Sequence, residues 1–262
     1  MAEYKKVKYY YDGELAEDLA EKIQPHYPAF DKTMFINMIA YNVEDLELKA
    51  RVNVFADALH TCLPENFPQA ASILHKILGP ENPNETGMFT EGYWLMPVAY
   101  FVEKYGLQHF DESVALIYEI TKRHTGEFAV RPFIQQYQAD MLAVMKSWSQ
   151  DENFHVRRLS CEGVRPRLPW AKKLDMFIDS PELILPILEN LKEDESRFVQ
   201  KSVANCLNDI LKDNYTTAMD VLRRWSQSNN KNTHWIVKHA LRNELKKQNP
   251  AAEAIIKKLI DS

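Results

Sequence analysis

The fold is decided by MLAVMKSWSQDENFHVRRLSCEG (residues 141–163), which recurs as ILPILENLKEDESRFVQKSVANCL (184–207) and AMDVLRRWSQSNNKNTHWIVKHALRNEL (218–245). In each stretch, an apolar helical pattern is followed by a polar turn and a second helical pattern. Trp148, Leu191 and Trp225 end the three first helices, at intervals of 43 and 34 residues. The second half of the chain is therefore predicted to be a series of helical hairpins.

A repeat of about 40 residues with two helices in each unit is typical of HEAT-like proteins. Such hairpins stack sideways because one hairpin alone cannot bury its apolar face. We therefore expect an all-α fold, a curved solenoid of HEAT-like helical hairpins whose second helices line the concave side. Helix starts are predicted at Ser180, followed by Pro181, and at Asp194 to Ser196.

The same organisation extends upstream of the repeats. DESVALIYEITKRH and GEFAVRPFIQQY, within 111–137, predict another hairpin with its turn at Gly126. LELKARVNVFADALHTCL (46–63) has the apolar spacing of an amphipathic helix, and GPENPNETGMFTEG (79–92) has the Pro, Gly and Asn content of a loop. We expect a single repeat domain over 1–262, with an N-terminal helical subdomain at 1–92 and the catalytic repeats at 93–262.

The composition excludes several function classes. The seven glycines include none beyond Gly163, and the chain has neither a dinucleotide-binding glycine motif nor a P-loop. Cys62, Cys161 and Cys206 are far apart, and the histidines share no ligand spacing, so no metal site is expected. The N-terminus has no apolar signal core, and stretches such as LILPIL are far shorter than a membrane span. A reduced, cytoplasmic protein without a membrane segment is expected.

The formal charge of −5 hides an asymmetry along the chain. Residues 122–247 carry 21 Lys and Arg against 16 Asp and Glu, whereas the two ends together carry 11 against 21. A polyanion would therefore meet the second half first. A solvated helix face could also carry such charge, and the asymmetry alone does not decide between the two readings.

Candidate functional residues lie on the second helices. Arg158, Lys201 and Lys238 follow the ends of the first helices by 10, 10 and 13 residues, and four residues later come Glu162, Asn205 and Arg242. Asp209 lies a further turn beyond Asn205, beside an apolar stripe, and Glu127 follows the turn at Gly126. From the residues alone, each acid could equally be a surface group, and Glu127 could be favoured by the macrodipole of a first helical turn.

The loop EGVRPRLPWAKK (162–173) is unusually basic and aromatic for a connection between repeats. Its two prolines restrict the backbone, so we expect Arg165, Arg167 and Trp170 to be displayed to a ligand. Arginine suits phosphates and an indole can stack on a base.

Four strings resemble, in order and spacing, the blocks of AlkC-type alkylpurine DNA glycosylases: GEFAVRPFI (126–134), HVRRLSCEGVRPRLPW (155–170), FVQKSVANCLNDILKD (198–213) and HWIVKHALR (234–242). ELKARV and LGP in the first hundred residues also resemble the family, so most of the chain is covered. At Gln200 the chain departs from the pattern, since a second basic residue is common there. That departure puts DNA contact at this repeat in doubt.

The resemblance implies a monofunctional base-excision repair enzyme that needs no cofactor. Its substrate would be duplex DNA carrying cationic N3-alkylated bases, 3-methyladenine and also 3-methylcytosine. The family's acids would fall on Glu127, Glu162 and Asp209, and its aromatic residue on Trp170. Because an N3-alkylated base is already cationic, it leaves without being protonated, and a carboxylate stabilises the oxocarbenium-like sugar and orients water.

Six basic residues are the candidates for phosphate contacts that hold and bend the duplex: Arg158, Arg165, Arg167, Lys201, His239 and Arg242. A monomer fits a solenoid that engages one duplex. Two other classes stay open, a non-catalytic HEAT-like protein that binds damaged or branched DNA, and a solenoid adaptor that binds a partner helix. The sequence does not rank 3-methyladenine, 3-methylcytosine and 7-methylguanine as substrates.

Overall fold

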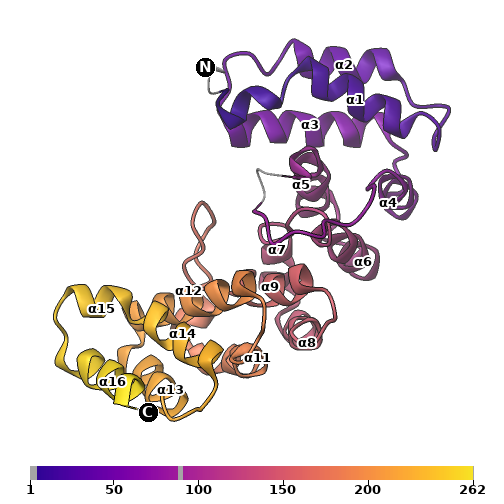
Figure 1. Ribbon diagram of the computed structural model, residues 1–262. Coiled ribbons are helices and arrows are strands. Elements are labelled where there is room, and N and C mark those ends of the chain that lie inside the picture. The colour runs from indigo at the N-terminus through magenta and orange to yellow at the C-terminus, as the bar shows by residue number, and fades with distance from the viewer. Residues whose placement is uncertain (1–4, 88–90, 262) are drawn as a thin grey trace. The chain divides into compact units, whose positions relative to one another are not determined.

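The computed structural model describes residues 5–87 and 91–261, and every regular element within these ranges is helical. The all-α prediction is therefore confirmed. Contacts divide the chain into two compact units, one ending at Phe133 and the other beginning at Ile134 (Figure 1). This division differs from the predicted subdomain boundary at residue 92, and a single functional domain over the whole chain stays a prediction. Part of the loop predicted at 79–92 (residues 88–90) lies outside the described residues.

The first unit is a bundle of short helices with two 3₁₀ turns. In chain order these are η1 (Val7–Tyr10), α1 (Gly13–Ile23), α2 (Lys32–Ala40), α3 (Leu48–Cys62), α4 (Phe67–Lys76), η2 (Tyr93–Leu95), α5 (Met96–Tyr105) and α6 (Phe110–Thr121). α3 packs against α2 and α5, and it buries Val52, Phe55 and Leu59 completely, as its apolar spacing predicts. The next helix, α7 (Val130–Gln136), spans the division between the units.

The second unit contains the predicted hairpins. Its elements are α8 (Gln138–Trp148), α9 (Phe154–Glu162), α10 (Asp175–Asp179), η3 (Pro181–Leu183), α11 (Leu185–Leu191), α12 (Arg197–Asp213), α13 (Tyr215–Trp225), α14 (Lys231–Ala240), α15 (Arg242–Lys246) and α16 (Pro250–Asp261). The helix pairs α8/α9, α11/α12 and α13/α14 are the three repeats. α12 packs against α9 on one side and α14 on the other, so the second helices form one layer (Figure 1).

The core of this unit consists of apolar residues at the predicted repeat positions. Trp148, Leu191 and Trp225 are all buried where the first helices end. Their burial removes apolar area from water between the two helices of each hairpin and between neighbouring hairpins.

Capping determines where the second helices begin. Asn153, Ser196 and Asn230 are the N-caps of α9, α12 and α14, and each side chain accepts a hydrogen bond from a backbone N–H of the first turn. The cap predicted at Ser180 is different, because Ser180 precedes the 3₁₀ turn η3 and makes no side-chain cap bond.

The caps also correct the register of the third repeat. Each N-cap lies five residues after the end of the preceding first helix, at 148, 191 and 225. Trp235, rather than Lys238, is therefore equivalent to Arg158 and Lys201. By the same count His239, rather than Arg242, is equivalent to Glu162 and Asn205. The prediction aligned the repeats by their basic residues. It misplaced the third repeat by three residues, because Trp235 stands where the other two repeats have Arg158 and Lys201.

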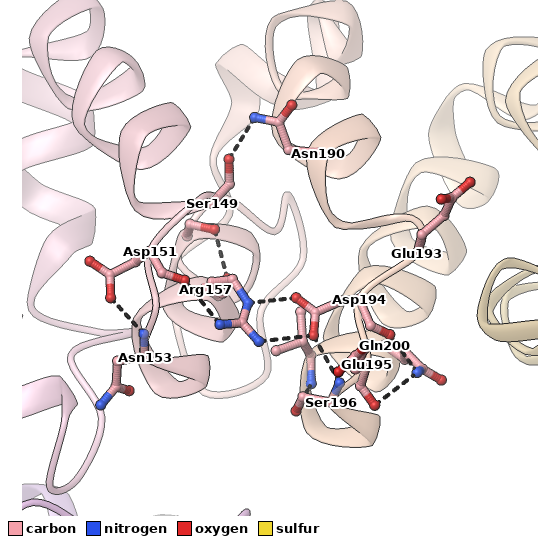
Figure 2. A network of polar contacts seen from close by, with 12 residues as sticks. Ser149, Asp151, Asn153, Arg157, Asn190, Glu193, Asp194, Glu195, Ser196 and Gln200 are labelled. Carbon is pink, nitrogen blue, oxygen red and sulfur yellow. Dashed lines mark hydrogen bonds and ion pairs between the residues drawn. The ribbon is translucent and has the colours of Figure 1, made fainter. Parts of the chain in front are cut away.

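A polar network joins the turns of neighbouring repeats (Figure 2). Arg157 of α9 donates from Nε and Nη2 to the two carboxylate oxygens of Asp194, at 2.7 and 3.2 Å, and also to the carbonyl oxygens of Asp151 and Glu152. Asp194 in turn accepts from the backbone N–H of Ser196 at 2.9 Å. The network orients α9 and α12 by locking the turns that precede them.

Gln200 belongs to this network. Its side chain is buried, and Nε2 donates to the carbonyl oxygen of Asp194 at 2.6 Å (Figure 2). The departure from a basic residue at this position is therefore explained by a role in the turn.

In the described residues, no helix is long and apolar enough to cross a membrane.

Candidate active site

Arg165 joins two of the predicted acids. Its Nη1 donates to Oε1 of Glu162 at 2.6 Å, and its Nε donates to Oδ2 of Asp209 at 2.9 Å. All three side chains are buried, with exposed fractions of 5% for Glu162, 7% for Arg165 and 2% for Asp209. One guanidinium therefore holds the carboxylates of α9 and α12 at a single place. We call these three residues the carboxylate pair and its bridging arginine.

The carboxylate oxygens have further donors. Ser202 of α12 donates to Oε2 of Glu162 at 2.6 Å, and Arg158 lies 3.6 Å from Oε1 of the same carboxylate. Lys212 donates to Oδ1 of Asp209 at 3.0 Å. Each carboxylate oxygen thus has at least one hydrogen-bond donor, as buried charges require.

These contacts set the ionisation of Glu162. Burial acts to raise the pKa of this carboxyl group, but the charges of Arg158 and Arg165 and the bonds from Ser202 and Arg165 outweigh it and lower the pKa below its ordinary value. Glu162 is therefore a carboxylate at neutral pH and has no proton to give. The carboxylates of Glu162 and Asp209 stabilise the charged form of Arg165, whose pKa rises although burial alone would lower it.

The helix geometry explains why these residues meet. Glu162 is the last residue of α9, where Gly163 closes the helix and Arg165 turns back onto the preceding side chains. Arg197, Lys201, Asn205 and Asp209 occur at intervals of four, so they lie along one face of α12. Because α9 and α12 are in contact, Glu162 at the end of α9 meets Ser202 of α12, and Arg165 just beyond that end meets Asp209.

The loop after α9 displays one aromatic side chain. The N–H of Ala171 donates to the carbonyl oxygen of Leu168 at 3.3 Å, so 168–171 form a tight turn with Pro169 second and Trp170 third. Trp170 has φ of 64°, a left-handed conformation that glycine normally supplies at that turn position, and its side chain is 73% exposed. A large aromatic residue held outward in a strained backbone is typical of a ligand-contacting position.

The loop is closed and anchored at its base. The N–H of Leu174 donates to the carbonyl oxygen of Pro166 at 3.1 Å, and Arg167 donates to both carboxylate oxygens of Asp213 at 2.6 and 2.5 Å. The loop connects α9 to α10 in the chain, and Figure 1 shows it projecting from the helices of its unit. Of the three side chains expected to be displayed, Arg165 is buried and Arg167 is paired with a carboxylate, so Trp170 alone is fully displayed.

A basic series continues along α12 from the carboxylate pair. Arg242 donates to Oδ1 of Asn205 at 2.9 Å and to the carbonyl oxygen of His239 at 2.7 Å. Lys201 lies one turn before Asn205 and is exposed. The structure thus places three predicted phosphate contacts, Arg158, Lys201 and His239, on the second helices, and the fourth, Arg242 of α15, contacts α12 through Asn205.

Glu127 belongs to the first unit. It is buried, accepts a hydrogen bond from Oγ1 of Thr125 at 3.1 Å, and has its own N–H bonded to the same hydroxyl. Its predicted place beside the carboxylate pair stays a prediction. Within the described residues, no three His, Cys, Asp or Glu side chains gather as metal ligands.

Sequence reasoning missed Ser202 and the bridging role of Arg165. Ser202 interrupts the apolar face of α12 with a small hydroxyl, and that interruption was the only local signal. The partner of Arg165 on α12 is 44 residues away, and no helical spacing reveals a contact of that kind.

Comparisons with known proteins relate the chain to DNA-repair enzymes. The family model described as DNA alkylation repair enzyme matches residues 108–244. The chain is 38% identical over 258 residues to the uncharacterised protein YhaZ of Bacillus subtilis (strain 168), covering 97% of this chain and 68% of that protein. It is also similar to the alkylpurine DNA glycosylase AlkC of Pseudomonas fluorescens, solved bound to DNA containing an abasic site analog. The TM-score is 0.86 at 34% identity, over 97% of this chain and 69% of that one.

Proposed function

The chain belongs to the DNA alkylation repair enzyme family, and from this premise we propose that it is a monofunctional DNA glycosylase. Its reaction would be hydrolysis of the N-glycosidic bond of cationic N3-alkylated bases in duplex DNA. 3-Methyladenine is the first substrate to expect, and 3-methylcytosine the second. The observation that carries the proposal is the carboxylate pair, bridged by one buried arginine in the region that the family model matches.

The chemistry follows from the charge of the lesion. An N3-alkylated base leaves as a neutral molecule when the glycosidic bond breaks, so no general acid is needed. The positive charge then develops on the deoxyribose as an oxocarbenium-like cation, which a nearby carboxylate stabilises electrostatically. Glu162 fits this requirement because its lowered pKa keeps it anionic.

The reaction gives the acids their proposed roles. Asp209 and Glu162 would stabilise the sugar cation and orient the attacking water, and Glu127 would be an additional acid that supports the reaction. Arg165 is a positioning residue, since it holds both carboxylates in one orientation through Glu162 Oε1 and Asp209 Oδ2.

The partner would be double-stranded DNA containing alkylated bases. Arg158, Lys201, His239 and Arg242 would contact phosphates, Trp170 would stack against a base or sugar beside the lesion, and Arg165 and Arg167 would support the site. The relative solved with DNA holds an abasic site analog, which is the state that follows base release. We propose that the protein acts as a monomer in the cytoplasm and uses no cofactor.

Two other classes predict different results. A non-catalytic DNA-binding protein would bind the same duplexes without releasing a base, and a protein adaptor would not bind them with a phosphate-dependent affinity. The presence of both acids, bridged by one buried arginine, favours catalysis over the first alternative.

The test is base release from duplexes that each carry one defined lesion, 3-methyladenine, 3-methylcytosine or 7-methylguanine. We expect free 3-methyladenine at a rate far above spontaneous loss and dependent on enzyme concentration. Binding of the duplexes without release of any base would establish the non-catalytic class instead.

A further inference from the structure

Three side chains form a stack on the second helices, away from the carboxylate pair. The guanidinium carbon of Arg197, the first residue of α12, lies 4.1 Å from the ring centre of Trp235 on α14. The ring of His239, one turn further along α14, lies 4.7 Å from the Trp235 ring with only 9° between their planes. The indole thus contacts both a guanidinium and an imidazole.

The cations around this stack have no carboxylate partners. Within the described residues, Arg197, Lys201 and Arg242 form no ion pair, and the bonds of Arg242 go to Asn205 and to a carbonyl oxygen. By contrast, the arginines of neighbouring α13 are neutralised, Arg223 by Asp220 and Arg224 by Glu189. The three unpaired cations, from α12 and α15, therefore surround His239 of the stack, which is the kind of environment that an anion site requires.

The pKa of His239 depends on these cations. Burial lowers the pKa of its imidazole, and the charges of Arg242, Lys201 and Arg197 lower it further. These groups come from α12 and α15, whereas the charged groups of α13 are occupied by their own carboxylates. The ring is therefore neutral at pH 7 and would gain a proton only if an anion offset its cationic neighbours.

We propose that Arg197, Trp235 and His239 form a second phosphate clamp, which holds the DNA backbone at a distance from the lesion and takes up a proton at His239 as it closes. The clamp rests on the proposed function in that its ligand is DNA. The indole holds the guanidinium flat, so the donor fork of Arg197 is oriented for a phosphate before binding. The phosphate, held also by Lys201, relieves the repulsion that keeps His239 neutral.

The spacing along α12 sets where the clamp acts. Arg197 and Asp209 are twelve residues apart on one helix, or about 18 Å at 1.5 Å per residue. Since one nucleotide of a duplex strand rises about 3.4 Å, the clamp lies about five nucleotides from the carboxylate pair. Its role is to hold and orient the duplex, with no contact to the reacting sugar.

Binding is measured by fluorescence anisotropy with a duplex that contains a tetrahydrofuran abasic-site analogue, over a series of salt concentrations. Arg197→Gln should weaken binding about tenfold at low salt and reduce the slope of log affinity against log salt by about one. Trp235→Leu should weaken binding in the same direction. Arg223→Gln, which removes a cation already paired on α13, is the matched control and should change neither quantity.

The proton uptake is measured by NMR, from the titration of the His239 ring with and without the same duplex. We expect the pKa of His239 to rise by about one unit on binding, and affinity to increase as the pH falls through that range. Either an unchanged salt slope in Arg197→Gln or an unchanged His239 pKa in the complex would overturn the clamp. Both measurements are independent of catalysis, so failure to release a base would count against the proposed glycosylase alone.

Discussion

The hydroxyl of Ser202 on α12 donates a 2.6 Å hydrogen bond to Oε2 of Glu162 at the end of α9, and both side chains are buried. The bond joins two repeats through a catalytic candidate. We predict that Ser202→Ala raises the pKa of Glu162 and lowers the free energy of unfolding by about 1–3 kcal/mol, because a buried carboxylate oxygen loses its donor. Urea unfolding measures the second effect. Equal stability at pH 7 would show that the carboxylate finds another donor.

Removal of the bridging arginine, Arg165, should lower the free energy of unfolding more than Ser202→Ala does. Arg165→Met leaves two buried carboxylates side by side, and we expect it to destabilise the protein by about 3–5 kcal/mol. The pKa of Glu162 lies below its ordinary value, so its stabilising contribution is complete above about pH 4.5 and is lost as the pH falls through the lower folded value. In Arg165→Met the folded pKa rises, and the loss should occur at higher pH.

Unfolding curves recorded between pH 3 and pH 8 test this shift, with Arg223→Met as a control for the loss of an exposed, paired arginine. An unchanged dependence of stability on pH in Arg165→Met would mean that Arg165 does not set the ionisation of the pair.

Substitutions of Trp170 should affect the stability of the fold and the release of the base differently. Its left-handed backbone costs about 1 kcal/mol relative to glycine, and its exposed indole makes little compensating burial. Trp170→Gly should therefore raise the free energy of unfolding by about 0.5–1 kcal/mol while weakening base release. Trp170→Ala keeps the strain and removes the indole, so it should weaken base release without the gain in stability. Full activity in both variants would remove Trp170 from the site.

The network between turns should be structural only. Arg157→Gln removes the two bonds to Asp194 and should lower the free energy of unfolding by about 1–3 kcal/mol. Base release at a temperature where the variant is folded should fall less than in any variant of the carboxylate pair. A double-mutant cycle with Asp194→Asn measures the coupling, and a coupling near zero would contradict the arrangement in Figure 2.

The helical repeats could be predicted from the sequence because their signals are local. Trp148, Leu191 and Trp225 mark the ends of first helices, and polar turns of equal length follow each of them. Asp209 could be selected because it lies one turn beyond Asn205, beside an apolar stripe. The predicted equivalence of Lys238 and Arg242 to residues of the other repeats was wrong. The N-cap fixes where a second helix begins, whereas a basic residue can occur at several positions along it.

The arrangement of the site depended on contacts that the sequence does not encode locally. Arg165 was expected to face a ligand, yet the buried carboxylates of Glu162 and Asp209 offer it stronger partners than solvent does. Trp170 was correctly expected on the surface, but its left-handed turn was not foreseen, since that turn position normally carries glycine. The stack of Arg197 on Trp235 joins residues 38 apart and was equally hidden.

The central claim is that the carboxylate pair drives glycosidic cleavage. It is tested most directly by single-turnover release of 3-methyladenine from a defined duplex by Asp209→Asn and Glu162→Gln. Asp220→Asn on α13 serves as the control, because its carboxylate is exposed and pairs only with Arg223. We predict that both site variants lose about 100-fold or more in rate while their affinity for the abasic-analogue duplex survives, and that the control is unchanged. Rates equal to the parent protein in both site variants would contradict the account.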